Sequence, residues 1–318
     1  MDAFIKSVIK RLSLAVLTML LASMLTFAAF NIIPGDPAAV MLGTEGTAEQ
    51  LAELRAELNL DKSLPERYGL WLGGFFTGKL GNSVRFRGEP ISGLILERLP
   101  VTLSLAALSF VLILLISIPA AVLLLGRENS PLDKIVDTGA SIMISFPGFF
   151  LGLLLIWLFG VFLKLFVPGL YTPYGQDPLA FLGGLVFPAL AVALPNAAVV
   201  VKFLRGALFR ELRSDYVRTA YSKGNSRSQA LYRHALKNAS IPALTLMGMI
   251  ASDLLSGSVV IEQVFTIPGI GRLLISSIAS RDFSMAQVIV VYTAFAVILA
   301  NALADIAIQI IDPRIRMK

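Results

Sequence analysis

Long uncharged apolar stretches constrain this chain more than any other feature of its sequence. A helix needs about 20 apolar residues to cross the roughly 30 Å hydrocarbon core of a bilayer, where its backbone must be hydrogen-bonded internally. Such runs recur along the chain, and a carboxylate interrupts only the last two: Leu12–Ile33, Val101–Leu125, Thr138–Leu163, Leu179–Val201, Ala239–Ile261 and Ser284–Ile311. The sequence therefore predicts an all-α polytopic membrane protein with six transmembrane helices.

Composition supports this class and excludes several functions. Hydrophobic residues make up 56% of the 318-residue chain and charged residues 15%, whereas soluble domains carry roughly 25% charged residues. There is no cysteine, and His234 is the single histidine. Disulfides, thiolate catalysis and cysteine or histidine metal clusters are therefore excluded. The net charge of +6 is better explained by membrane topology than by nucleic-acid binding.

Recognisable enzyme motifs are also missing. The chain lacks HExxH and GxSxG, the signatures of zinc proteases and serine hydrolases. The stretch 73–79, GGFFTGK, has the spacing of a phosphate-binding loop, but Leu80 follows where Ser or Thr must bind Mg²⁺. We therefore predict that this chain is not an enzyme and binds no cofactor or metal itself.

The distribution of Lys and Arg predicts the orientation. Most of the 27 cations fall on the side that holds both termini, including a dense group between Lys202 and Lys237. Cytoplasmic loops carry an excess of Lys and Arg. Both termini and the loop 202–238 are therefore expected in the cytoplasm.

The domain organisation follows from these spans. Residues 1–33 form an N-terminal segment and a retained first helix, because the apolar run is too long for a signal peptide and has no cleavage site. Residues 34–100 form an extracytoplasmic insertion, in which Thr47 caps a helix with Leu51, Leu54 and Leu58 on one face. Residues 101–318 form a transmembrane core.

Carboxylates inside apolar runs are costly and usually functional. Asp253 lies near the middle of its run, and Glu262 and Asp305 lie towards the ends of theirs. Two interpretations of Asp253 stay open, a polar lining of a substrate path and a structural hydrogen bond between helices. Asn196 and Ser256 are further candidates for the path. Asp305, four residues after Asn301, favours the structural role, and an intramembrane hydrolase would need Asp253 and Asp305 to meet.

The loop 214–238 is more than a solvated, charged connection. Ser214 or Asp215 is expected to cap a short helix over Tyr216–Lys223 that ends at Gly224, and Ser226 to cap a second helix over 227–237. Aromatic and aliphatic side chains remain among the charges, as in a helix that docks into a groove on a partner.

Several stretches resemble the binding-protein-dependent ABC importer permeases of the dipeptide, oligopeptide and nickel group. The strongest is YVRTAYSKG followed by RHALKNASIPALT, which is similar to the loop that couples such permeases to their ATPases. IPGDP at 33–37, the region from ELNLDKSLPERYGL to GNS, the stretch 261–287 and DPRIR at 312–316 also fit. The resemblance covers nearly the whole chain, in order, and is to the first of the two permease subunits.

The resemblance implies candidate residues for two regions. Residues implied in coupling to the ATPases are Asp215, Tyr216, Arg218, Thr219, Ala220, Lys223, Gly224, Arg233 and His234, with Ala220 permitting close approach. Residues implied on the side of the gate and the binding protein are Phe265, Pro268, Gly269, Arg281 and Asp282. Arg218, Thr219, Tyr221, Asn225 and Thr266 depart from the general pattern of these positions.

The resemblance also implies a type I ABC importer permease fold in the bacterial inner membrane and a set of partners. These are a homologous second permease, two cytoplasmic ATPases that use ATP and Mg²⁺, and an extracytoplasmic substrate-binding protein. Short peptides are the expected substrate, with nickel, a metal chelate or a glutathione-like compound as alternatives. The competing class is a secondary transporter or channel, which would need coupling-ion groups or an inverted repeat.

Overall fold

A computed structural model describes residues 2–32, 37–42, 47–57, 59–86, 88–124, 127–128, 130–226, 229 and 235–311. Its elements are all helical. They are α1 (Asp2–Ile32), α2 (Pro37–Leu42), α3 (Ala48–Glu57), α4 (Leu64–Thr77), α5 (Ile91–Leu123), α6 (Pro131–Ser145), α7 (Gly148–Leu155), the π-helix η2 (Ile156–Phe162), α8 (Pro178–Leu212), α9 (Asp215–Ser222), α11 (Leu236–Val264), α12 (Ile270–Ala279) and α13 (Phe283–Ile311).

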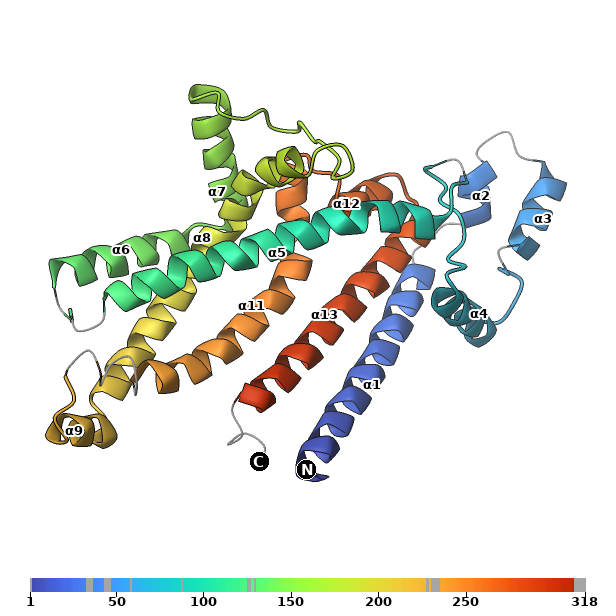
Figure 1. The fold of residues 1–318 in the computed structure, drawn as a ribbon. Coiled ribbons are helices and arrows are strands. Elements are labelled where there is room, and N and C mark those ends of the chain that lie inside the picture. The colour runs from blue at the N-terminus through green and yellow to red at the C-terminus, as the bar shows by residue number, and fades with distance from the viewer. Residues whose placement is uncertain are drawn as a thin grey trace.

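The membrane-spanning elements confirm the predicted class. Within the described residues, α1, α5, α8, α11 and α13 are long and apolar enough to cross a bilayer, and the pair formed by α6 with α7 and η2 would make a sixth span. The first residues of α1 and the last of α13 lie at the same end of the bundle as α9, while α2, α3, α7 and α12 lie at the opposite end (Figure 1).

The third predicted span, Thr138–Leu163, is wrong as a single straight helix. The chain bends by 100° between α6 and α7, where Phe146 is extended with φ −92° and ψ 126°. Pro147 forces this break because a proline disfavours the helical conformation of the residue before it. Pro119 and Pro188, in contrast, remain inside α5 and α8.

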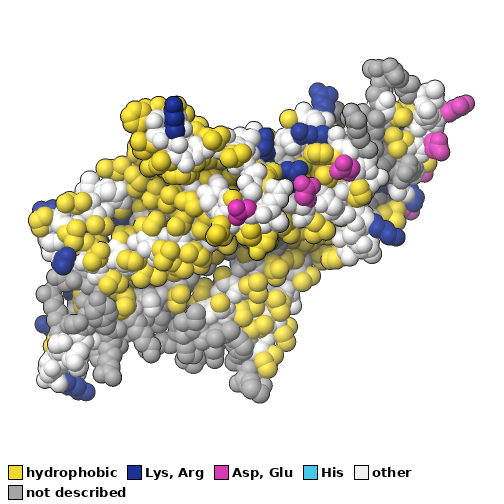
Figure 2. All heavy atoms as spheres, turned by 45° about the horizontal axis from the view of Figure 1, so that its top comes forward, with side chains coloured by type: hydrophobic (Ala, Val, Ile, Leu, Met, Phe, Trp, Pro, Cys, Tyr) yellow, Lys and Arg dark blue, Asp and Glu magenta, His cyan; other side chains and the backbone are white. Residues whose placement is uncertain are grey.

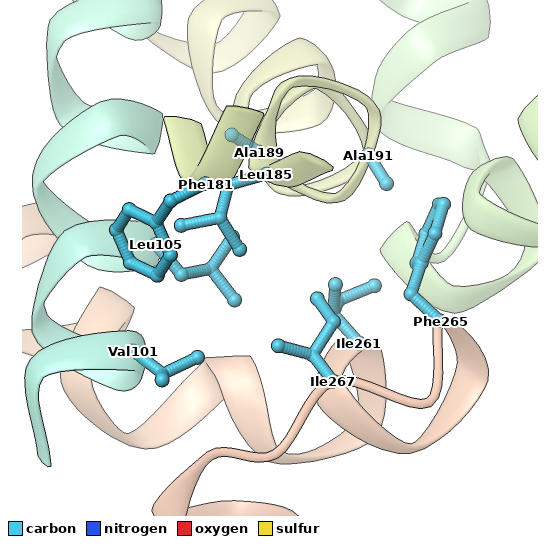
Figure 3. Packing of buried hydrophobic residues seen from close by; sticks show 9 residues of the cluster. All are labelled: Val101, Leu105, Phe181, Leu185, Ala189, Ala191, Ile261, Phe265 and Ile267. Carbon is cyan, nitrogen blue, oxygen red and sulfur yellow. The ribbon is translucent and has the colours of Figure 1, made fainter. Parts of the chain in front are cut away.

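Helix α8 is the centre of the bundle. It packs against α5, α6, α7 and α11, while α1 packs against α13. Alanines 189, 191, 193 and 197 of α8 are buried, and small side chains of this kind let helix backbones approach closely in a membrane. One apolar cluster joins α5, α8 and the end of α11 (Figure 3): Val101, Leu105, Phe181, Leu185, Ala189, Ala191, Ile261, Phe265 and Ile267.

The outer surface of the helices is apolar as well. Leu25 of α1 and Phe162 of η2 are each 70% exposed. Figure 2 shows hydrophobic side chains over much of the visible surface, with Asp and Glu side chains towards one side of it and Lys and Arg side chains mostly near its edges. A surface of this kind is suited to lipid or to a second membrane subunit rather than to water.

A network of ion pairs fastens α6 to α8. Arg205 donates from Nε to Asp133 Oδ1 at 2.6 Å and from Nη2 to Asp133 Oδ2 at 2.7 Å, and Asp133 is buried. Arg205 also contacts Asp137 at 3.3 Å, and Lys202 donates to Ser141 Oγ at 2.6 Å. Such a two-pronged guanidinium–carboxylate pair fixes geometry as well as charge.

The insertion between α1 and α5 packs on the first span. Thr47 and Gln50 form reciprocal capping bonds at the start of α3, which confirms the cap predicted for Thr47. In α4, Tyr68 hydrogen-bonds Ser23 of α1 at 2.8 Å, and its ring lies edge-on to Phe27. The insertion is therefore held against the bundle rather than standing apart.

Most of the GGFFTGK stretch is helical. Helix α4 continues to Thr77 and ends at Gly78, whose φ is +75°. The residues that would cradle a phosphate with their free N–H groups are used in helical hydrogen bonds instead. These hydrogen bonds give a structural reason to expect that residues 73–79 do not bind a nucleotide.

Candidate coupling helix, membrane cavity and outer pocket

Helix α9 projects from the end of α8. Helix α8 runs without a break to Leu212, and a turn at Arg213 and Ser214 redirects the chain into α9. Gly224 ends this unit with φ +83°, a conformation that favours glycine. Asn225 N–H then bonds the Ala220 carbonyl at 3.2 Å. The helix and the glycine turn lie where the sequence predicts them.

Helix α9 has a buried face and an exposed face. Val217 and Ala220 pack against Ala235 and Leu212 of this same chain. The close approach expected of Ala220 towards a partner is therefore corrected, because Ala220 is 6% exposed and lies on the inner face. The exposed face carries the other predicted coupling residues of this helix and its end: Asp215, Tyr216, Arg218, Thr219, Lys223 and Gly224.

Tyr216 is anchored at one edge of that exposed face. Its hydroxyl donates a hydrogen bond to Glu211. Partial burial, followed by this hydrogen bond, raises the pKa of Tyr216 above its ordinary value. Tyr216 therefore keeps its proton at neutral pH and holds the start of α9 to the end of α8. Arg233 and His234, the two other predicted coupling residues, lie outside the described residues.

A cavity of about 310 Å³ lies between α7, α8 and α11. Asp253 and Asn196 both line it, with Gly148, Phe149 and Pro195 among the remaining lining residues. Ser256 is exposed but does not line the cavity, and its hydroxyl bonds the Asp253 carbonyl at 3.2 Å. The structure thus brings together two of the three residues predicted for the path.

Asp305 does not share this cavity. It forms an ion pair with Arg11 of α1, while the residues around Asp253 come from α7, α8 and α11. The structural role expected of Asp305 is confirmed, although its partner is Arg11 rather than Asn301. A hydrolase built on Asp253 and Asp305 has no support, because the two carboxylates face different helices.

Glu262 is a buried anchor whose role the sequence did not reveal. Its carboxyl group accepts from Thr102 Oγ1 at 2.7 Å and from the Arg272 N–H at 3.0 Å, at the first turn of α12. A Cβ on Gly269 would lie 2.3 Å from this carboxyl group. Gly269 is therefore required for close approach, and Glu262 fastens the 265–269 turn to the transmembrane helices.

Two other residues predicted on the gate side are buried. Phe265 is 2% exposed and belongs to the apolar cluster of Figure 3. Asp282 is fully buried, caps α13 through Met285 N–H at 3.1 Å and accepts from Ser83 Oγ at 2.5 Å. Both can position the loops that flank α12, but neither reaches the surface. Arg281, beside them, is exposed.

A cavity of about 690 Å³, named the outer pocket below, lies at the end of the bundle opposite to α9. The predicted Pro268 and Gly269 line it, together with three arginines that sequence reasoning missed: Arg85, Arg98 and Arg272. Among the described residues, Arg85 and Arg272 have no carboxylate within ion-pair distance, and Arg98 Nε has no hydrogen-bond partner. The sequence offered these cations only as indicators of topology, since they are far apart in the chain.

The described part of the chain holds no group of three or more acidic, histidine or cysteine side chains placed to bind a metal. The polar features are instead an exposed helix at one end, a carboxylate in a membrane cavity and an arginine-lined pocket at the other end. A polytopic helical bundle with these features belongs to the class of membrane transport components.

Comparison with known proteins defines the family. Residues 113–317 match the family described as binding-protein-dependent transport system inner membrane component, and residues 4–106 match the N-terminal region of such membrane components. The chain belongs to this family. Its members are the permease components of ABC transporters, which are not themselves catalytic, and the chain is an inner-membrane protein.

Curated relatives align along nearly their whole length. A putative peptide transport system permease protein of Brucella abortus is 38% identical over 97% of this chain and 98% of its own. The oligopeptide transport system permease protein AppB of Bacillus subtilis is 33% identical over 97% of this chain and 98% of its own length. The dipeptide transport system permease protein DppB of Lactococcus lactis is 33% identical over 98% of this chain and 100% of its own length.

Proposed function

We propose that this chain is the transmembrane subunit of an ATP-driven importer that moves short peptides delivered by a substrate-binding protein. The observation that carries this proposal is α9, a short helix with an exposed polar face, held on the end of the central helix α8. The substrate class rests on the relatives, whose names specify peptides, dipeptides or oligopeptides. None of these names specifies nickel, a chelate or glutathione.

The assembly we propose contains this chain, a homologous second permease, two cytoplasmic ATPases and an extracytoplasmic binding protein. ATP and Mg²⁺ bind the ATPases alone. Closure of the ATPases displaces α9, and α8 carries this displacement into the bundle because α8 contacts α5, α6, α7 and α11. The spans then alternate between inward-facing and outward-facing arrangements, with Asp253, Asn196 and Ser256 on the path.

The direct test is reconstitution of the whole transporter in proteoliposomes. The chain is produced together with its cognate permease, ATPases and binding protein. It is expected to co-purify with the permease and the ATPases. The ATPase activity of the reconstituted complex should rise when peptide-loaded binding protein is added, and labelled dipeptide should accumulate in the proteoliposomes only with ATP. Flux through this chain without ATP or ATPases would favour a secondary transporter or channel.

The proposed orientation places α9 in the cytoplasm and the insertion outside. Because the chain has no cysteine, single cysteines report accessibility without background from this subunit. In spheroplasts, an impermeant maleimide should label Lys62→Cys, in the outer insertion, and should label Arg127→Cys only after permeabilisation. Labelling of Arg127→Cys in intact spheroplasts would contradict the orientation.

The outer pocket is the proposed docking point for acidic side chains of the binding protein. Arg272→Glu reverses a charge in this pocket and should weaken docking about 3- to 10-fold at low salt, with a smaller effect at high salt. Surface plasmon resonance with the immobilised transporter measures this change. Lys62→Glu, a charge reversal on an exposed outer residue away from the pocket, is the matched control. Equal weakening by both variants would show that only the overall outer charge matters.

A further inference from the structure

Several charged side chains of the membrane-spanning helices are paired with one another in the described part of the chain. Arg11 pairs with Asp305, Arg205 with Asp133 and Lys202 with Asp137. Glu262 is hydrogen-bonded by Thr102, by Ser258 and by backbone. The Asp253 carboxylate, in contrast, has no hydrogen bond or ion pair with any other described residue, and Asp253 is exposed in the isolated subunit.

An unpaired carboxylate on a membrane-spanning helix faces either water or a partner from outside the chain. Asp253 lies nine residues before Glu262 on α11, which corresponds to about 13 Å along the helix. Ionisable groups inside a membrane are costly and normally face a partner or an aqueous cavity. Asp253 faces the 310 Å³ cavity, a volume at the lower end of the range for small-ligand sites, about 300–1,000 Å³.

The chemistry of the cavity favours a small cation with several hydrogen-bond donors. Asn196 donates from Nδ2 to the Val192 carbonyl at 2.9 Å, so its side-chain oxygen remains as a second acceptor beside the carboxylate. An ammonium group has three donors and no acceptor. The other lining residues carry no charge: Gly148, Phe149, Val192, Pro195, Leu254, Gly257, Val260 and Ile261.

We infer that Asp253 and Asn196 form a subsite for the α-ammonium group of the transported peptide. This inference rests on the proposed function. Every unmodified peptide carries that ammonium whatever its side chains, so one carboxylate gives recognition that is independent of peptide sequence. A cation from the second permease is the competing partner for Asp253, and the experiment below distinguishes the two.

The test uses the purified, assembled transporter, in which every partner subunit is a cysteine-free version. Val260, an exposed residue that lines the cavity, is replaced by cysteine, and its labelling rate with a neutral maleimide is measured without the binding protein. Millimolar dialanine should slow labelling of Val260→Cys several-fold, whereas N-acetyl-dialanine should not. Adding Asp253→Asn should abolish this protection, and adding Asp253→Glu should retain it. Arg127→Cys is the control, and neither peptide should change its labelling.

Each alternative outcome overturns the inference. Protection that survives Asp253→Asn, equal protection by N-acetyl-dialanine, or no protection by dialanine would exclude an ammonium subsite at Asp253. Loss of the second permease from the purified Asp253→Asn complex would assign the carboxylate to subunit pairing. Failure of the wild-type transporter to accumulate dipeptide would instead reject the proposed function, so the two failures are distinguishable.

Discussion

Replacing Gly224 by valine is expected to uncouple ATP hydrolysis from transport while the subunit still inserts. Gly224 has φ +83°, which a β-branched residue adopts only at a cost of about 1–3 kcal/mol. A Cβ at this position meets no atom within 4 Å, so the penalty comes from the backbone and not from a clash. Since each 1.4 kcal/mol is a factor of ten, the native turn after α9 should become about 5- to 150-fold less populated. Peptide uptake and ATPase stimulation by the loaded binding protein should fall accordingly.

Gly224→Asn is the matched control for this experiment. Asparagine tolerates positive φ far better than valine does, so it should keep most of the uptake despite its larger side chain. Normal uptake by Gly224→Val would show that the turn after α9 does not transmit force. Equal loss in both variants would show that side-chain bulk at this position matters more than backbone conformation.

Removal of Arg205 is expected to destabilise the subunit more than other single changes outside the apolar core. Arg205→Ala takes the two-pronged guanidinium away from the buried Asp133 carboxylate. Breaking a buried ion pair by removing one partner costs about 3–5 kcal/mol, and we expect the lower end because the Arg205 side chain is 24% exposed. The detergent-solubilised transporter should unfold at a clearly lower temperature in a thermal-shift assay.

The double variant Arg205→Ala with Asp133→Asn separates charge from packing. Neutralising Asp133 removes the unpaired carboxylate, so the double variant should recover much of the lost thermal stability. If it is no more stable than Arg205→Ala alone, the loss comes from the packing of Arg205, whose guanidinium also lies 5.0 Å from the Phe209 ring. A fully stable Arg205→Ala would mean that the pair does not fasten α6 to α8.

The cap of α3, helix α9 and the turn that follows it could be predicted because each depends on residues close together in the sequence. Each, including the turn at Gly224, is found where the sequence places it. What could not be predicted is which face of α9 points outwards. Ala220 is small, and only its contact with Ala235, fifteen residues later, shows that it belongs to the inner face.

The residues of the outer pocket and the membrane cavity were only partly predictable, for a related reason. Arg85, Arg98 and Arg272 are distant in sequence, and their common pocket exists only once the insertion and α12 lie side by side. The resemblance implied Asp282 on the side of the gate and the binding protein, but it did not reveal that Asp282 is buried in contact with Ser83. Side chains separated by almost two hundred residues give no periodic signal.

Hydropathy and local motifs were enough to predict the class of this protein, its family and all but one of its membrane-spanning helices. Hydrophobicity is a property of each residue, and a bilayer requires about 20 such residues in a row, so these features can be read without knowing any contact. The tertiary structure alone decided that Pro147 breaks its span while Pro119 and Pro188 do not. It also decided that Asp305 is neutralised by Arg11, whereas Asp253 faces a cavity. These outcomes depend on which helix packs against each residue, because a membrane charge or a lost backbone hydrogen bond is tolerated only where a neighbour compensates it.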